Sequence, residues 1–407
     1  MKNSKKFALL GEKLSHSFSK EIHNMLGDYQ YELVEIEKGK LGEFFDHTDL
    51  DGFNVTIPYK NEAMEYCKSL SDRAKKIGCV NTVVRLDDGS FYGDNTDYFG
   101  FQKLLGDTSF SGKALVLGSG GASKTVKTVL EEKGFSPVVV ISRSGEDNYE
   151  NLHKHFDAKL IVNATPVGMY PHNRKSPLSL KGFKDLKLVL DLIYNPARPA
   201  LLLESERLGI ENRNGLYMLV AQAKLASEQF LKKEIDDSEI DRICRILAGK
   251  TQNIVLIGMP GCGKSTIGKA LAEKLGRNFA DTDALFEEKF GLSPEKMITS
   301  EGETAFREKE SEVLSEVCKK SGLVVSTGGG IVMVDKNYDL MHQNGMIVYL
   351  DRNLNELVCN NRPLSLKNGV KKLYEIRAPR YSSWCDFSVK VNGIDETANE
   401  IINMLQR

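Results

Sequence analysis

Short runs of apolar and β-branched residues alternate along most of the chain with longer stretches in which apolar residues recur at helical spacing. Strands that alternate with helical segments are typical of parallel sheets connected by crossover helices. The pattern therefore predicts an α/β fold. The predicted strands cover Lys113–Leu117, Pro137–Ser142, Leu160–Asn163, Leu186–Leu192, Ile254–Ile257, Leu323–Ser326 and Met346–Leu350.

Two breaks in this pattern divide the chain. The clearer one is the stretch AGKTQN, residues 248–253, which follows a helical segment and precedes a new strand. The softer one lies near residues 108–112. A chain of 407 residues is too long for one core, since a domain holds roughly 150 residues. We therefore expect three modules over residues 1–108, 109–248 and 249–407, with the helical segment 215–248 packing back on the first.

Composition narrows the function classes. Hydrophobic residues make up 41% and charged residues 27% of the chain, as in ordinary globular proteins. The formal net charge of -1 gives no support for binding to nucleic acid or to an anionic membrane. No apolar run approaches the ~20 residues of a membrane span, and the first residues do not read as a signal peptide. The seven cysteines are scattered without a CxxC pair, which favours a reducing cytoplasm over a disulfide framework or a zinc site.

The first candidate ligand site is a glycine-rich turn. The strand KALVL runs into GSGG and then into a helical stretch, which is the order of a dinucleotide-binding turn, although a tight turn without a ligand gives the same pattern. The next strand ends at Arg143 rather than at an acidic residue. This favours NADP over NAD, because arginine pairs with a 2′-phosphate, unless Arg143 is only a solvated surface residue. The candidate cofactor residues are Gly118, Gly120, Gly121, Ala122, Ser142, Arg143 and Ser144.

A second glycine-rich turn gives a stronger signal. GMPGCGKST follows the strand NIVLI, opens a helix and satisfies the GxxxxGK[ST] pattern of a phosphate-binding loop. Its backbone N–H groups would cradle the phosphates of ATP, Lys264 would reach the β/γ-phosphates and Ser265 would bind Mg²⁺. The alternative is a glycine-rich turn that binds no nucleotide. The candidate residues are Gly258, Gly261, Cys262, Gly263, Lys264, Ser265 and Thr266.

An ordered set of motifs covers nearly all of residues 1–248. LSHSFSKEIHN, FNVTIPYK, IGCVNTVV and GDNTDYFGF precede the first glycine-rich turn, and ISRS, NATPVGM, DLIYNPARPALL and NGLYMLVAQA follow it. In this order and spacing the motifs resemble shikimate dehydrogenase. The resemblance implies a two-module enzyme with a Rossmann-type NADP domain that reduces 3-dehydroshikimate to shikimate with NADPH.

By that resemblance, Lys60 and Asp97 form the catalytic pair. Reducing a ketone needs a hydride on carbon and a proton on oxygen, and the cofactor supplies the hydride. Either member of the pair could donate the proton; we favour the Lys60 ammonium, which can also stabilise the developing oxyanion. The resemblance further implies substrate contacts from Ser15, Ser17, Thr56, Asn81, Asp97, Tyr194 and Gln222, and cofactor contacts from Asn163, Thr165, Gly215 and Met218.

A second ordered set follows the phosphate-binding loop. FADTD, GETAFREKE, STGGGIV, NNRPL and EIRAPRY together resemble shikimate kinase over residues 252–407. The resemblance implies a P-loop domain with a parallel sheet that phosphorylates shikimate to shikimate 3-phosphate. Lys264, Asp283 and Arg362 would act in catalysis, with Arg362 on a lid, and Asp281 would reach Mg²⁺ through water. The implied substrate contacts are Asp283, Arg307, Gly328, Gly329, Gly330 and Arg377.

The two implied activities share shikimate, which is the product of the first and the substrate of the second. We therefore expect a bifunctional cytoplasmic enzyme on the route to aromatic amino acids, with small-molecule partners and with NADP(H), ATP and Mg²⁺ as cofactors. Two alternatives stay open: the first half prefers quinate or uses NAD, or the second half is a nucleotide-binding regulatory module without transfer activity. No arginine just before NNRPL is suited to stack on adenine, so the sequence leaves the adenine contacts and the oligomeric state open.

Overall fold

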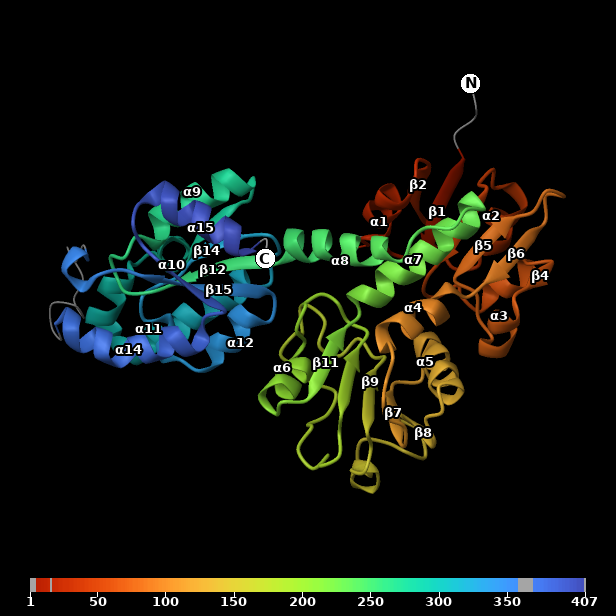
Figure 1. The fold of residues 1–407 in the computed structure, drawn as a ribbon, viewed down its shortest axis with the longest axis horizontal. Helices are drawn as coiled ribbons and strands as arrows, with labels where there is room; N and C mark the ends of the chain where they lie inside the picture. The colour runs from red at the N-terminus through yellow and green to blue at the C-terminus, as the bar shows by residue number, and fades with distance from the viewer. Residues whose placement is uncertain (1–4, 15–16, 358–368, 406–407) are drawn as a thin grey trace. The chain divides into compact units, whose positions relative to one another are not determined.

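A computed structural model of the chain describes residues 5–14, 17–357 and 369–405. Three sheets organise these residues, and the chain divides into two compact units (Figure 1). The first unit comprises Met1–Tyr194 with Pro199–Leu247, and the second comprises Asn195–Arg198 with Ala248–Arg407. Two of the sheets belong to the first unit and one belongs to the second.

The first sheet has six strands in the order β2-β1-β3-β5-β6-β4. It is mixed, because β5 runs antiparallel to both β3 and β6, so the expectation of parallel sheets throughout is wrong here. Between β5 and β6 the chain reverses in a tight turn, in which Leu86 N donates to Ser90 O at 2.7 Å and Gly89 has a positive φ of 85°. An Asp-Asp-Gly sequence suits such a turn, and a hairpin needs no crossover helix. The elements are β1 Lys6–Gly11, α1 Ser19–Leu26, β2 Gln30–Glu35, α2 Leu41–His47, β3 Gly52–Val55, β4 Ser69–Leu70, α3 Asp72–Ile77, β5 Thr82–Arg85, β6 Phe91–Asp94 and α4 Thr96–Leu105.

The second sheet is wholly parallel, with the order β11-β10-β9-β7-β8. An apolar core fills each face: α4, α5 and α7 pack on one side, and α6 packs on the other. The strand predicted over Leu160–Asn163 is present with the same bounds, and the other three strands predicted in this region lie within two residues of their expected ends. The elements are β7 Ala114–Leu117, α5 Gly121–Glu132, β8 Val138–Ile141, β9 Leu160–Asn163, β10 Leu188–Asp191, α6 Ala200–Arg207, β11 Glu211–Asn214 and α7 Leu216–Leu231.

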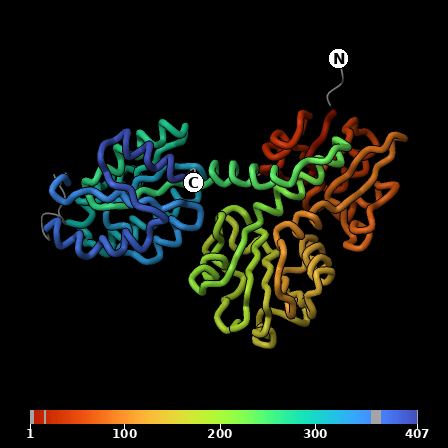
Figure 2. Tube along the Cα trace, in the orientation of Figure 1, coloured from red at the N-terminus to blue at the C-terminus, as the bar shows by residue number. Residues whose placement is uncertain are grey.

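The third sheet, in the second unit, is also parallel, with the order β13-β14-β12-β15-β16. Its three predicted strands are present to within one residue at each end. The last helix, α15, lies against α9 beside this sheet (Figures 1 and 2), where Ala398 and Ile401 pack with Leu271 and Ala272. The elements are β12 Asn253–Ile257, α9 Lys264–Leu275, β13 Phe279–Asp281, α10 Thr282–Phe290, α11 Pro294–Val317, β14 Val324–Ser326, α12 Lys336–His342, β15 Gly345–Asp351, α14 Val370–Trp384, β16 Phe387–Lys390 and α15 Ile394–Leu405.

The predicted connector AGKTQN is mostly helical. Helix α8 runs over Ser238–Thr251 without interruption, and only Gln252 separates it from β12. This stretch contains one glycine and no proline, so a helix can continue through it with only a small loss of helix stability. The carbonyl of Gln252 accepts a hydrogen bond from Arg277 Nη1 at 2.8 Å, which holds the turn into β12. Across the described ranges, no helix combines the length and the apolar character that a membrane span requires.

Candidate active sites

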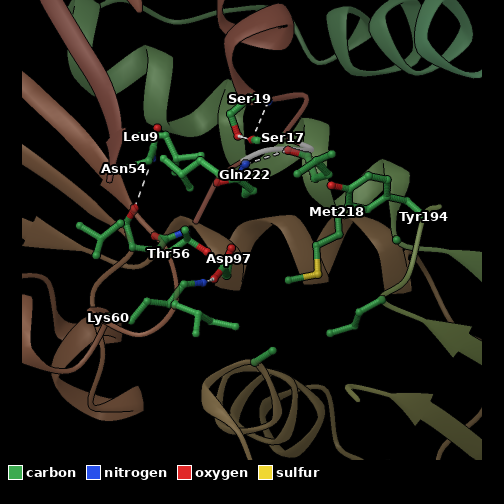
Figure 3. A pocket seen from close by; sticks show the side chains of 18 of the residues that line it. Leu9, Ser17, Ser19, Asn54, Thr56, Lys60, Asp97, Tyr194, Met218 and Gln222 are labelled. Carbon is green, nitrogen blue, oxygen red and sulfur yellow. Dashed lines mark hydrogen bonds and ion pairs between the residues drawn. The ribbon is translucent and has the colours of Figure 1, made fainter. Parts of the chain in front are cut away.

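A cavity of about 540 Å³ opens in the first unit. Its walls come from α1, β3, α4 and α7, together with the start of α5 and the segment after β10 (Figure 3). The cavity therefore lies between the first and the second sheet, which is where a substrate and a cofactor could meet. Its lining includes the predicted catalytic residue Lys60, the predicted substrate residues Ser17, Thr56, Asn81, Asp97, Tyr194 and Gln222, and the predicted cofactor residues Ala122, Gly215 and Met218.

Lys60 and Asp97 form an ion pair on the wall of this cavity, with Lys60 Nζ 2.5 Å from Asp97 Oδ2 (Figure 3). Asp97 lies in the first turn of α4, and Lys60 follows β3. Burial disfavours the charge of Lys60, but the attraction of the Asp97 carboxylate outweighs burial and raises the pKa of the Lys60 ammonium. A lysine that stays protonated in a cavity can donate a proton to an oxygen bound there.

Two serines lie at the start of α1. Ser17 Oγ is 2.9 Å from Ser19 Oγ and accepts from Ser19 N at 3.2 Å, and both residues line the cavity. Hydroxyl groups at a helix N-terminus suit a carboxylate, since the helix dipole favours negative charge there. Ser15, the other serine that we predicted, lies outside the described residues, whereas Ser19 was not predicted.

A buried network orients the amide side chains of the cavity. Asn81 Oδ1 accepts from Thr96 N at 2.6 Å, and Thr96 Oγ1 lies 3.4 Å from Gln222 Oε1. Asn54, which also lines the cavity, donates from Nδ2 to Thr82 Oγ1 at 3.0 Å. These contacts fix the amides on the cavity wall, where they can hydrogen bond to the hydroxyl groups of a ligand.

The first glycine-rich turn connects β7 to α5, as the sequence predicts. Gly118 has a φ of 101°, and a Cβ at this position would lie 2.8 Å from Thr165 Cγ2, so only glycine fits. A Cβ on Gly120 or Gly121 would meet no atom within 4 Å. The turn is therefore open on the side where α5 presents its first N–H groups, which suits a phosphate.

The predicted cofactor residues beyond this turn fall into two groups. Arg143 and Ser144 are exposed after the end of β8, with Ser142 half-buried beside them. Asn163 is fully buried, and its side chain contacts Thr165 and Asp191 instead of the cavity. Asn163 therefore shapes the loop after β9, and its contact with a cofactor stays a prediction.

The phosphate-binding loop lies between β12 and α9. Gly258, Gly261 and Gly263 all have positive φ values, which glycine adopts without strain. Lys264 Nζ donates to the carbonyl of Gly258 at 2.9 Å, and Cys262 is fully buried. Ser265, the next residue after Lys264, donates from Oγ to Asp281 Oδ2 at 2.6 Å.

Charged residues from three helices and a run of three glycines gather beside this loop. Asp283 lies in α10, Arg307 in α11 and Arg377 in α14, while the Gly328–Gly330 run follows β14. A Cβ on Gly328 would lie 2.9 Å from Asp283 Oδ1, and a Cβ on Gly330 would lie 2.1 Å from Arg307 Nη2. Arg377 Nη1 donates to the carbonyl of Gly329 at 3.2 Å. The structure thus brings together the residues that we predicted to bind the second substrate.

Glu310 completes this cluster. It accepts from Arg307 Nη1 at 2.7 Å and is almost wholly buried. The pKa of Glu310 is raised by its burial and by the negative charge of the nearby Asp283, although the positive charge of Arg307 acts to lower it. Burial also lowers the pKa of Arg377. The two arginines can therefore hold an anion with their guanidinium groups already fixed in place.

A cavity of about 430 Å³ lies in the second unit, at the carboxyl ends of β15 and β16. Arg352 Nη1 lies 3.8 Å from the position of a Cβ on Gly263, so this cavity is next to the phosphate-binding loop. Ligands of parallel sheets bind at this edge of the sheet. Its polar lining includes Asp351, Arg352, Asn353, Tyr374, Lys390 and Asn392, whereas the predicted lid residue Arg362 lies outside the described residues.

Comparisons with known proteins agree with this division. The family described as "Shikimate dehydrogenase substrate binding domain" matches residues 9–83. A Clostridium beijerinckii protein named shikimate dehydrogenase (NADP(+)) is 36% identical over 253 residues, which cover 57% of this chain and 93% of that protein. The chain belongs to the shikimate dehydrogenase family. The family described as "Shikimate kinase" matches residues 260–406, so the chain also carries a shikimate kinase domain.

Solved structures match the dehydrogenase part. A chorismate mutase/shikimate 5-dehydrogenase fusion protein from Clostridium acetobutylicum is 35% identical, with a TM-score of 0.57, and the match covers 60% of this chain and 97% of that one. The Thermus thermophilus shikimate 5-dehydrogenase, solved in complex with NADP(H) and shikimate, is 31% identical, with a TM-score of 0.54 and coverage of 60% and 99%. With both domains present, the chain is a bifunctional enzyme of the shikimate pathway.

Two residues at these sites, Ser19 and Glu310, were assigned no role from the sequence. Ser19 repeats the hydroxyl of Ser17 two positions later, and this spacing before a helical stretch was a signal that could have been used. Glu310 follows Arg307 by three positions, so both side chains lie on one face of α11 of the kinase domain. Glu310 was visible in the motif GETAFREKE, but its burial beside Arg307 became clear only from the fold.

Proposed function

We propose that the enzyme reduces 3-dehydroshikimate with NADPH and then phosphorylates the resulting shikimate with ATP. One observation carries this proposal: each unit gathers, from segments far apart in the sequence, the groups that one of these two consecutive reactions requires. The shared intermediate explains why a single chain would hold both sites.

In the dehydrogenase part, the Lys60 ammonium is proposed to donate the proton that the carbonyl oxygen takes up, with Asp97 orienting it. Nicotinamide chemistry supplies the hydride. Ser17 and Ser19 would hold the substrate carboxylate, and Asn81 and Gln222 its hydroxyl groups. All these residues line one cavity, which can exclude water around the reacting carbonyl.

NADP(H) is the proposed cofactor. The C. beijerinckii relative carries NADP(+) in its name, and the T. thermophilus structure contains NADP(H). In this chain the exposed Arg143 has no ion-pair partner within the described residues, and it stands where a 2′-phosphate would lie after β8. The proposed contacts of the pyrophosphate are the N–H groups of the Gly118–Ala122 turn.

In the kinase domain, Asp283 is proposed to orient the acceptor hydroxyl of shikimate, and Arg307 and Arg377 to bind its carboxylate. Lys264 would neutralise charge on the transferring phosphoryl group. The hydroxyl of Ser265 and the carboxylate of Asp281 supply the oxygen ligands that suit Mg²⁺, which would compensate the charge of the phosphates. The cavity beside Arg352 would hold the nucleoside of ATP, since it adjoins the phosphate-binding loop.

The boundaries of the parts remain proposals as well. We propose a substrate-binding domain over residues 1–108, a cofactor domain over 109–248 and the kinase domain over 249–407, with residues 215–248 packing on the first domain. In α7, Phe230 stacks on Phe7 of β1 with ring centroids 4.3 Å apart, which supports this last assignment. We propose a cytoplasmic location, because a reducing compartment suits free cysteines.

The test uses purified full-length protein with 3-dehydroshikimate, NADPH, ATP and Mg²⁺, with NADPH absorbance and the masses of the products followed together. Shikimate 3-phosphate should form only when both NADPH and ATP are present. If NADPH is consumed and the reaction stops at shikimate, the kinase assignment fails. If quinate with NAD gives a higher kcat/KM than shikimate with NADP, the substrate and cofactor assignments of the first part fail.

A further inference from the structure

A buried carboxylate in the cofactor domain has no role in the proposed chemistry. Asp191 is the last residue of β10 and is fully buried. Its Oδ1 atom accepts two hydrogen bonds, and within the described residues its Oδ2 atom has no hydrogen-bond partner. A buried carboxyl group with an unsatisfied oxygen is costly, so its presence calls for a compensating function.

The first hydrogen bond leads to the loop after β9. Asp191 Oδ1 accepts from Asn163 Nδ2 at 3.0 Å, and Asn163 Oδ1 in turn accepts from Thr165 N at 3.0 Å and from Thr165 Oγ1 at 2.7 Å. Thr165 lies against the glycine-rich turn, where its Cγ2 atom would be 2.8 Å from a Cβ on Gly118. Asp191 is therefore connected, through Asn163, to the residue that borders the phosphate end of the proposed NADP site.

The second hydrogen bond leads to the start of α7. Asp191 Oδ1 also accepts from Ile193 N at 3.0 Å, and Ile193 O accepts from Gly215 N at 3.0 Å. A Cβ on Gly215 would lie 2.0 Å from Leu192 O, so these two segments are in close contact. Leu192 and Gly215 both line the cavity. Asp191 thus reaches the other end of the proposed cofactor site as well.

We propose that Asp191 is a positioning residue that holds Thr165 and Gly215 in register for binding of NADPH. This inference rests on the proposed function of the dehydrogenase part, and it adds a residue that touches neither substrate nor cofactor. In this role Asp191 needs the Oδ1 atom as a hydrogen-bond acceptor, and it does not need a negative charge. Burial raises the pKa of Asp191 to about 7 against the opposing effect of its two hydrogen bonds, so a large fraction of the carboxyl group is protonated near neutral pH.

The test compares Asp191→Ala with Asp191→Asn in the full-length protein. Asparagine keeps an acceptor oxygen at Oδ1, whereas alanine leaves Asn163 Nδ2 without this acceptor. We expect Asp191→Ala to weaken NADPH binding about tenfold, measured by NADPH fluorescence, and Asp191→Asn to stay within about threefold of the unchanged protein. Asp185→Ala, which removes an exposed carboxylate from the same domain, is the matched control. Far-ultraviolet circular dichroism and thermal unfolding of the same samples report whether the dehydrogenase part is folded.

A double-mutant cycle separates positioning from a loss of stability. If Asp191 acts through Asn163, the effects of Asp191→Ala and Asn163→Ala on the dissociation constant of NADPH must be less than additive. An Asp191→Ala protein with a lowered Tm and an unchanged NADPH dissociation constant would overturn the proposal, as would an Asp191→Asn protein as defective as the alanine variant. The binding assay needs no turnover, so a wild-type protein that binds no NADPH would refute the proposed function instead.

Discussion

At the scale of single residues, burial decides what each charged or polar group can do. Lys60 keeps its proton because Asp97 lies 2.5 Å away, and the attraction of this carboxylate keeps a charged donor in the cavity although burial opposes the charge. His23, in contrast, is fully buried beside Tyr29 and Ser227, and burial lowers its pKa to about 3. The same effect of burial thus leaves one residue charged and the other neutral, according to the partner that each one has.

We predict that Ser17→Ala and Ser19→Ala each raise the KM of the reductase for 3-dehydroshikimate about tenfold, because each removes a hydroxyl hydrogen bond to a carboxylate. Ser15→Ala should have a smaller effect if the pair at the start of α1 is the binding element. Steady-state reduction kinetics measure this, and the KM of the kinase for shikimate is the control within each sample. A Ser15 variant that is more defective than the Ser19 variant would contradict the assignment.

We also predict that the dehydrogenase part loses stability as the pH falls below 6.5. The unfolded chain protonates His23 near pH 6.5, but the folded protein does so only near pH 3, so acid favours the unfolded state. The contribution of the neutral His23 to the free energy of unfolding is fully present above pH 6.5, and about 2 kcal/mol of it is lost at pH 5. Urea unfolding is carried out at several pH values between 7.5 and 5 and is monitored by the loss of reductase activity. It measures how steeply the free energy of unfolding changes with pH.

The matched control for this pH dependence is His153→Gln, which removes an exposed histidine and should leave the slope unchanged. His23→Gln should reduce the slope, since glutamine does not titrate. A free energy of unfolding that is constant from pH 7.5 to 5 in the unchanged protein would show that His23 is accessible to protons in the folded state.

The sequence predicted most of the polar residues that the structure gathers at the two sites, and it assigned no role to those that only packing distinguishes. Lys60, Asp97, Asp283 and Arg307 stand in ordered motifs, so the spacing along the chain was enough to find them. Asp191 and Glu310 also stand in these motifs, but only burial and a specific partner distinguish them from surface carboxylates. For Asn163 the motif suggested a cofactor contact, and the structure adds that its side chain is buried and donates a hydrogen bond to Asp191.

At the scale of elements, the chemistry lies at the carboxyl ends of strands. The glycine-rich turns follow β7 and β12, and the triple glycine follows β14. Parallel strands were predicted well because apolar runs flanked by glycine are distinctive. The sequence did not predict the hairpin of β5 and β6 or the extension of α8 to Thr251. Short connecting segments have similar sequences whether they form turns or helix ends.

We predict that Gly330→Ala impairs the kinase and also lowers its stability, because a displaced Arg307 would leave the buried Glu310 unpaired. The added Cβ would lie 2.1 Å from Arg307 Nη2, and the backbone φ of -102° tolerates alanine, so the arginine side chain would move rather than the fold. The KM of the kinase for shikimate should rise about tenfold or more, because a bidentate charged hydrogen bond is lost. Kinase kinetics and thermal unfolding measure the two effects separately.

Gly249→Ala is the matched control for this substitution. Gly249 lies within α8, and a Cβ there would meet no atom within 4 Å. Alanine should stabilise this helix by up to about 1 kcal/mol and leave both activities unchanged. If Gly330→Ala lowered the Tm by several degrees with an unchanged KM, the triple glycine would serve packing rather than substrate binding.

At the scale of the whole molecule, each active site is built from residues of a single unit. The lining of the larger cavity comes entirely from the first unit, and Lys264, Asp283, Arg307 and Arg377 all belong to the second. Each unit also has hydrophobic cores of its own. The two sites therefore need no residue from one another, and the covalent connection alone does not require shikimate to pass directly between them.

This independence leads to a prediction about mixed variants. Lys60→Ala should abolish reduction and preserve phosphorylation, while Asp283→Asn should do the reverse, because each change removes a group from one site only. An equimolar mixture of the two proteins should then convert 3-dehydroshikimate to shikimate 3-phosphate, since shikimate released by one chain can bind to the other. Product masses with NADPH, ATP and Mg²⁺ measure the conversion, and each variant alone is the control. A mixture that accumulates shikimate and also fails to phosphorylate added shikimate, although the unchanged protein forms shikimate 3-phosphate, would show that the kinase site takes its substrate only from its own chain.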